Sequence, residues 1–197
     1  MAQLTTRRLR LRQWRAADLE SFASLNADPL VMELMPRCLT RAESDELALR
    51  AAAEIEQRGW GLWAVQLREG GDFLGAAGLC VPSFEAHFTP CVEIDWRLKR
   101  PSWGHGYATE GAGECLRFAF ESLRLSEVVS FTVPANARSR AVMERLGMRH
   151  DGAGDFDHPC LPAGHPLRHH VLYRLTRDAW QRSQGRRRPQ APPAQAP

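Results

Sequence analysis

Three glycines lie within the nine residues WGHGYATEG (103–111). Upstream, the segment CVEIDWRL (91–98) alternates apolar and polar residues, which predicts a strand. Downstream, apolar residues at helical spacing predict a helix: Ala108, Ala112, Cys115, Leu116, Ala119 and Leu123. A glycine turn at a helix N-terminus exposes backbone N–H groups, which bind phosphate together with the helix dipole. The spacing therefore predicts a site for a phosphate-bearing ligand.

Two common phosphate motifs do not fit this segment. A Walker loop requires Lys and then Ser or Thr after its second glycine, whereas Gly106 is followed by Tyr107 and Ala108. A dinucleotide fingerprint requires an acidic residue at the end of the next strand, where this chain has Val133 and Pro134.

A third motif fits better. Residues 103–108 resemble the pyrophosphate loop Q/R-x-x-G-x-G/A of the Gcn5-related N-acetyltransferases (GNAT), with Trp103 in first place, as in the branch similar to ribosomal-protein N-acetyltransferases. Residues 134–148 resemble a second motif of the family, P-x-N-x-x-S followed by E-x-x-G-F/M. The segments RLRLRQW (8–14) and NADPLVMELMP (26–36) also resemble this branch, so the similarity covers roughly residues 6 to 178.

The resemblance implies the GNAT fold, an α/β (α+β) architecture in which helices flank both faces of a mixed, mostly antiparallel sheet of about seven strands. Alternation and turn residues predict strands at 8–13, 61–67, 73–79, 91–98, 127–133, 148–155 and 169–176. Capping residues predict helices at 18–26 and 137–146. Thr40 and Glu43 predict a capping box for a helix that runs through Arg58 and ends at Gly59.

The resemblance also implies acetyl-CoA as the co-substrate and a primary amine as the acetyl acceptor. Backbone N–H groups of residues 104–109 would hold the pyrophosphate, and the end of the strand at 96–98 would pair with the pantetheine arm and polarise the thioester carbonyl. The expected cofactor-binding residues are Trp96, Arg97, Leu98, Trp103, Gly104, His105, Gly106, Tyr107, Ala108, Thr109, Asn136 and Ser139.

Two proton transfers need side chains. A primary amine is ionised at neutral pH, with a pKa of about 8 for an α-amino group and about 10.4 for Lys, so a base must remove a proton. Glu93 is our candidate catalytic base, and Asp95, two residues along the same strand face, is the alternative. Many relatives protonate the departing thiolate with a Tyr where this chain has Met143. Ser139 is therefore the leading candidate for proton donor or for contact with the CoA sulfur, while Tyr173 is expected in the core or pocket wall.

The acceptor itself stays open among a protein N-terminus, a lysine and a small amine. The segment 156–168 is rich in proline, glycine and histidine, and by resemblance we expect it to border the acceptor pocket. Because Met143 replaces the usual acid, a non-catalytic module that binds or senses acyl-CoA is the alternative function.

The composition limits the number of domains, the partners and the cellular compartment that we expect. The chain has 197 residues, 44% of them hydrophobic, which predicts one domain at 1–181 and a disordered Arg/Pro-rich tail at 182–197. Four arginines of the tail account for the net charge of +3, since residues 1–181 carry 22 basic and 23 acidic side chains; we expect no nucleic-acid partner.

The five cysteines form no C-x-x-C pair, which argues against a metal. Without an apolar run of about 18 residues or a signal peptide, we expect a cytoplasmic protein with no membrane segment, and a homodimer is one alternative for its assembly.

Overall fold

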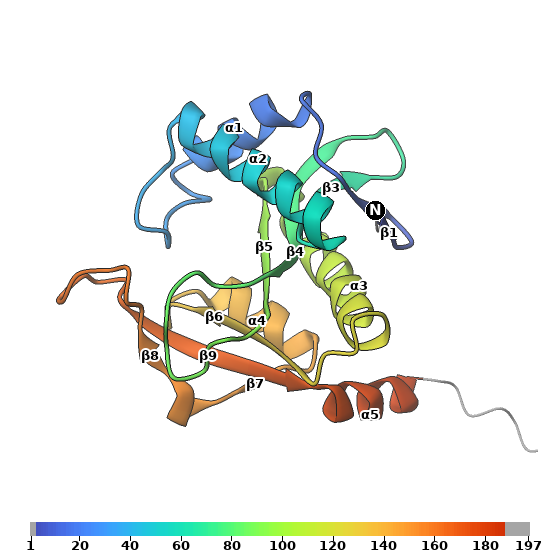
Figure 1. Ribbon diagram of the computed structural model, residues 1–197. Coiled ribbons are helices and arrows are strands. Elements are labelled where there is room, and N and C mark those ends of the chain that lie inside the picture. The colour runs from blue at the N-terminus through green and yellow to red at the C-terminus, as the bar shows by residue number, and fades with distance from the viewer. Residues whose placement is uncertain (1–2, 188–197) are drawn as a thin grey trace, which may run out of the picture.

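The computed structural model describes residues 3–187, and within them a nine-stranded sheet forms the centre of the molecule (Figure 1). Its order along the sheet is β1 (Leu4–Thr5), β2 (Leu9–Arg12), β3 (Leu62–Leu67), β4 (Phe73–Cys80), β5 (Glu93–Leu98), β6 (Glu127–Thr132), β9 (His169–Thr176) and β7 (Arg149–His150), with β8 (Phe156–Asp157) also paired to β9. In this part of the chain every pairing is antiparallel except that of β5 with β6. The predicted mixed, mostly antiparallel sheet is confirmed.

Helices cover both faces of the sheet. They are α1 (Asp18–Ala27), α2 (Arg41–Arg58), α3 (Tyr107–Glu121), α4 (Ala137–Arg145) and α5 (Arg177–Arg187), with short 3₁₀ turns η1 (Arg100–Ser102) and η2 (Gly152–Gly154). Figure 1 shows α1 and α2 on one side of β3, β4 and β5, with α3 on the other side. No helix in the described part of the chain has the length and apolar character needed to cross a membrane.

The predicted bounds of α2 are confirmed by its caps. The Thr40 hydroxyl accepts a hydrogen bond from the Glu43 backbone N–H, and the Glu43 carboxylate accepts one from the Thr40 N–H at 2.8 Å. Gly59 ends the helix in the left-handed conformation, with φ of +80°.

The sequence-based prediction was wrong at the last strand pair and incomplete at the N-terminus. Within the predicted strand 148–155 only β7 is a strand; η2 follows it, and β8 lies at the start of the segment 156–168 that we predicted as a loop. At Gly154, in η2, a side chain would lie 2.6 Å from the Asp151 carboxylate. The additional β8 and the unpredicted β1 raise the strand number from about seven to nine in the described residues. The predicted start of the tail, residue 182, falls inside α5, and residues 188–197 lie outside the described part.

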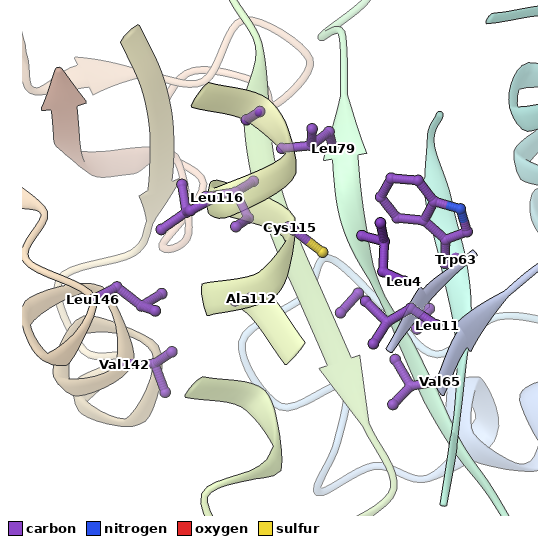
Figure 2. Packing of buried hydrophobic residues seen from close by; sticks show 14 of the residues in the cluster. Leu4, Leu11, Trp63, Val65, Leu79, Ala112, Cys115, Leu116, Val142 and Leu146 are labelled. Carbon is purple, nitrogen blue, oxygen red and sulfur yellow. The ribbon is translucent and has the colours of Figure 1, made fainter. Parts of the chain in front are cut away.

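The main core lies between the sheet and its helices. Figure 2 shows Cys115 of α3 pointing toward Leu11 of the sheet, whereas Leu116 lies toward Val142 and Leu146 of α4. Helix α3 is therefore packed between the sheet and α4, which fixes the position of the glycine turn at its N-terminus.

A smaller phenylalanine cluster packs on the β6 and β9 end of the sheet. It contains Phe84, Phe88, Phe131 and Phe156 around Val129 and Leu172. The Phe88 and Phe156 rings lie 4.8 Å apart, and those of Phe84 and Phe131 lie 5.7 Å apart.

A buried ion pair fixes α1 to the sheet. Two guanidinium nitrogens of Arg12 in β2 donate to the two Asp18 carboxylate oxygens at 2.7 and 2.8 Å, and each side chain is only 5% exposed. Arg12 also donates to Gln66 in β3 at 2.9 Å. The pair matters for the site because the last turn of α1 carries Asn26, which contacts β5 as described below.

Removal of one partner should leave an uncompensated buried charge. We expect Asp18→Asn to lower the free energy of unfolding by about 3–5 kcal/mol, measured by urea denaturation. The matched control is Asp45→Asn, whose partner Arg41 is an exposed neighbour on α2, and it should cost less than about 1 kcal/mol. Equal losses in the two variants would contradict the role given to the buried pair.

Candidate active site

The parallel strands β5 and β6 are paired at one position in the described chain. Glu93 lies opposite Val129, and the Val129 N–H donates to the Val92 carbonyl at 3.0 Å. Beyond this point the strands diverge, and a cleft of about 1530 Å³ opens between them. The edge of β5 that faces the cleft keeps backbone groups outside the sheet pairing: the Trp96 N–H and the Leu98 carbonyl bond to side chains instead.

Every residue that we predicted as catalytic or cofactor-binding lines this one cleft. The predicted residues come from β5, from the glycine turn and from the start of α4, which are distant in sequence but adjacent here. The structure therefore brings the whole predicted set together.

The glycine turn has the backbone geometry that its sequence predicts. Gly104 and Gly106 adopt φ of +79° and +78°, and Gly106 is the N-cap of α3 without a side-chain hydrogen bond to the cap. A Cβ on Gly104 would meet no described atom within 4 Å, so the glycine is required by its conformation and not by crowding. The first backbone N–H groups of α3 are thus directed at the cleft, where an anion would be stabilised.

Two arginines that the sequence did not single out lie beside the turn. The Arg8 guanidinium lies 4.6 Å from the centre of the Tyr107 ring, and that of Arg138 lies 4.2 Å from Trp103. The Trp103 indole N–H in turn donates to the Leu98 carbonyl at 2.9 Å. Arg138 directly precedes Ser139 in the second motif, which is a usable signal, whereas Arg8 reaches the turn only through the fold.

The two candidate bases lie in the cleft on the same face of β5. Burial raises the pKa of the Glu93 carboxyl well above its ordinary value, and the nearby Asp95 charge raises it further. Cys80, opposite Glu93 on β4, donates its S–H to the Glu93 carboxylate at 3.7 Å. Asp95 accepts the Trp96 N–H at 2.7 Å. Both carboxyls therefore face the cleft, and Glu93 holds its proton more tightly than an exposed glutamate does.

Arg97 has a role beyond the strand position expected from the sequence. Its guanidinium donates to the Asn26 side chain of α1 at 2.7 Å, and Asn26 donates to the Ser44 hydroxyl of α2 at 2.9 Å. Asn26 and Ser44 are fully buried, and burial lowers the pKa of Arg97, which the Asp95 charge opposes. This buried chain of hydrogen bonds joins β5 to α1 and α2, and its members are too far apart in sequence to be paired by inspection.

Helix α4 delivers the remaining predicted residues. The Asn136 side chain caps the helix by accepting the Ser139 N–H at 3.1 Å, as predicted, and it donates to the Thr132 hydroxyl at 2.9 Å. Ser139 and Met143 line the cleft one turn apart. Tyr173 lies in the core outside the cleft, where its hydroxyl donates to the Glu144 carboxylate at 3.2 Å.

Comparison with known proteins supports the family indicated by these motifs. The chain matches the acetyltransferase (GNAT) domain family over residues 8–149. It is 35% identical over 173 residues to the FsC-acetyl coenzyme A-N(2)-transacetylase of Aspergillus fumigatus, an alignment that covers 81% of this chain and 70% of the relative.

Solved structures agree with the fold. A GNAT-family acetyltransferase from Bacillus anthracis superposes with a TM-score of 0.74 at 22% identity, over 90% of this chain and 99% of that one. An acetyltransferase from Agrobacterium tumefaciens gives a TM-score of 0.70 at 28% identity, over 89% and 94% of the two chains. From the family match and the Aspergillus relative, the chain belongs to the GNAT family of acetyltransferases and is an acyltransferase.

Proposed function

We propose that this acyltransferase transfers the acetyl group of acetyl-CoA to a primary amine, with Glu93 as the general base. The observation that supports the proposal is the cleft between β5 and β6, which connects an anion-binding helix N-terminus to a buried carboxyl. The name of the Aspergillus relative, an acetyl coenzyme A N(2)-transacetylase, supports a nitrogen atom as the acceptor.

The chain supplies donors that suit the parts of CoA. The N–H groups at the start of α3 suit the pyrophosphate. Arg138, whose guanidinium lies over the Trp103 ring, adds a positive charge near the glycine turn. The unpaired edge of β5 at Trp96 suits the amide groups of the pantetheine arm. This assignment places the acetyl group near Glu93, where the two strands begin to diverge.

The reaction needs one base and one acid. The amine gives a proton to Glu93, directly or through water, and its nitrogen then attacks the thioester carbonyl carbon. The new N–C bond forms as the C–S bond breaks, and the second proton of the attacking nitrogen passes to the CoA thiolate, directly or by relay, to give the amide and the free thiol. A raised pKa suits Glu93 to this role because the transfer from an ammonium becomes less unfavourable. Ser139 is the hydroxyl on α4 that we assign to the thiolate, as proton donor or as contact to the sulfur, since Met143 carries no proton to give.

A screen for CoA release against N-terminal peptides, lysine derivatives and small amines, with product mass, tests the proposal. Acetylation of an amine is the expected result. Binding of acetyl-CoA without thiol release from any acceptor in the panel would instead support the non-catalytic acyl-CoA module that Met143 suggests.

The base can be identified by two isosteric substitutions. We expect Glu93→Gln to lower kcat/KM by about 10²–10⁴-fold because the amine loses its proton acceptor, while the Kd of acetyl-CoA changes by less than about twofold. Asp95→Asn should have a smaller effect on kcat/KM. A larger loss in Asp95→Asn would transfer the role of base to Asp95, and full activity in both variants would refute a carboxylate base.

The glycine turn can be tested against a matched glycine elsewhere. Both Gly106 and Gly59 have φ near +80°, and each lies at a helix terminus, Gly106 at the start of α3 and Gly59 at the end of α2. Gly59 does not line the cleft. Alanine in this conformation costs about 1–2 kcal/mol. We expect Gly106→Ala to weaken acetyl-CoA binding about tenfold, measured by calorimetry, and Gly59→Ala to leave it unchanged. Equal effects on binding would show that the turn does not hold the cofactor.

The raised pKa of Glu93 also predicts how stability depends on pH. Because the folded protein binds the Glu93 proton more tightly than the unfolded chain does, stability is lost as pH rises through the folded pKa. Relative to Glu93→Gln, which never ionises, the wild type should therefore become less stable as the pH rises above the ordinary Glu pKa of about 4.3, measured by urea denaturation. Glu69→Gln, at an exposed turn position, should show no such trend. A constant difference between wild type and Glu93→Gln would contradict the burial of this carboxyl.

A further inference from the structure

The end of the cleft beyond Glu93 has an aromatic wall that the reaction itself does not require. Phe131 of β6, His158 and His170 line it, and the two imidazoles lie 5.1 Å apart. The Phe131 ring lies 6.2 Å from His158 and 6.0 Å from His170. Phe84 and Phe156 of the phenylalanine cluster contact His158 and support the wall from behind.

Exposed aliphatic residues also line the cleft. Leu30 and Met35, in the loop that follows α1, are 49% and 37% exposed, and both line the cleft. They are two of the four large hydrophobic side chains that are exposed in the described residues. Apolar side chains that gather in a concave surface indicate an apolar ligand.

At this end of the cleft, the negative charges come from Glu93 and Asp95 of β5 among the described residues. Among the described residues, the carboxylates in the lining are Glu33, Glu93, Asp95 and Glu110. Glu110 is paired with Arg8 at 2.6 Å and Glu33 lies 3.5 Å from Arg138, so both belong to the side of the glycine turn. Only Glu93 and Asp95, of the carboxylates described, remain for an acceptor ammonium.

The arginines that line the cleft either contact other residues of the protein or lie on the proposed CoA side. Arg97 donates to Asn26 and lies beside Asp95, while Arg138 and Arg145 come from α4, on the proposed CoA side. Burial lowers the pKa of His158, and His170 lowers it further. Burial also lowers the pKa of His170, which the hydrogen bond to the Arg168 carbonyl opposes, so both imidazoles favour the neutral form more than exposed histidines do.

We propose that the acceptor is a primary monoamine whose amino group is attached to an apolar or aromatic body without a second charge. The inference rests on the proposed acetyl transfer and names its substrate class. The ammonium is neutralised by the carboxyls of Glu93 and Asp95, and the body lies against the aromatic wall of Phe131, His158 and His170. A second ammonium would lose water against aromatic rings and aliphatic groups, and the α-carboxylate of a free amino acid would meet no uncommitted cation among the described lining residues.

Matched amines separate these classes. With the full chain and acetyl-CoA, CoA release gives kcat/KM for phenethylamine, phenylalanine, 1,4-diaminobutane and a Phe-Gly amide dipeptide, each corrected for its fraction of neutral amine. We expect phenethylamine to exceed phenylalanine and diaminobutane by about tenfold or more. The dipeptide offers the same apolar group on a peptide N-terminus, so the ratio of phenethylamine to dipeptide tells a small amine from a protein acceptor.

A substitution in the aromatic wall tests the charge argument directly. His158→Glu adds a carboxylate to the wall that a second ammonium would meet, and it should raise kcat/KM for diaminobutane relative to phenethylamine about tenfold. Leu49→Glu is the matched control, since Leu49 is 61% exposed on α2 and lies outside the cleft lining, and it should leave the ratio unchanged.

The outcomes separate the two proposals. Turnover that favours diaminobutane or phenylalanine, or a ratio that His158→Glu does not change, would overturn the inferred substrate class and leave acetyl transfer intact. Binding of acetyl-CoA with no thiol release from any of the four amines or from the wider acceptor panel would overturn the proposed function itself.

Discussion

The arrangement of the site depends on a single parallel pairing between β5 and β6. At Glu93 and Val129 the strands are held together, and beyond that position each strand follows its other neighbour, β4 or β9. The divergence exposes the edge of β5 inside the molecule, where backbone groups would otherwise be costly to leave outside the sheet. The Trp96 N–H meets that requirement by bonding to the Asp95 carboxylate, and the Leu98 carbonyl meets it by accepting from the Trp103 indole N–H.

The two ends of the cleft differ in physical character. The glycine turn and the start of α3 form an end whose backbone N–H groups suit phosphate, and the arginines beside it, Arg8 and Arg138, lie close to Glu110 and Glu33. Phe131 and the two histidines form an aromatic end. Glu93 lies between them, buried enough for its pKa to rise. The proposed reaction therefore takes place where the environment changes from polar to apolar.

The sequence predicted the fold and the backbone geometry of the glycine turn well, because those features depend on local patterns. Strand alternation, the capping box at Thr40 and the positive φ of Gly104 and Gly106 are set by neighbouring residues. The failures have a common cause in contacts between distant segments. The 3₁₀ turn that contains Gly154 depends on Asp151 and on packing against β9, and the contact of Arg97 with Asn26 depends on the docking of α1. The charge at the end proposed for the acceptor could not be predicted from the sequence either, because it depends on which arginine side chains have partners in the folded protein.

Trp103 gives the glycine turn a property that its glycines alone would not provide. Its indole N–H is bonded to the Leu98 carbonyl at the end of β5, and its ring stacks with Arg138 at the start of α4. A turn with two left-handed glycines would otherwise sample many conformations. Because one side chain ties it to both neighbouring elements, the turn loses that conformational entropy on folding, before any ligand arrives. The cleft is thus preorganised at the glycine turn, so a ligand bound there is opposed by less ordering of the chain.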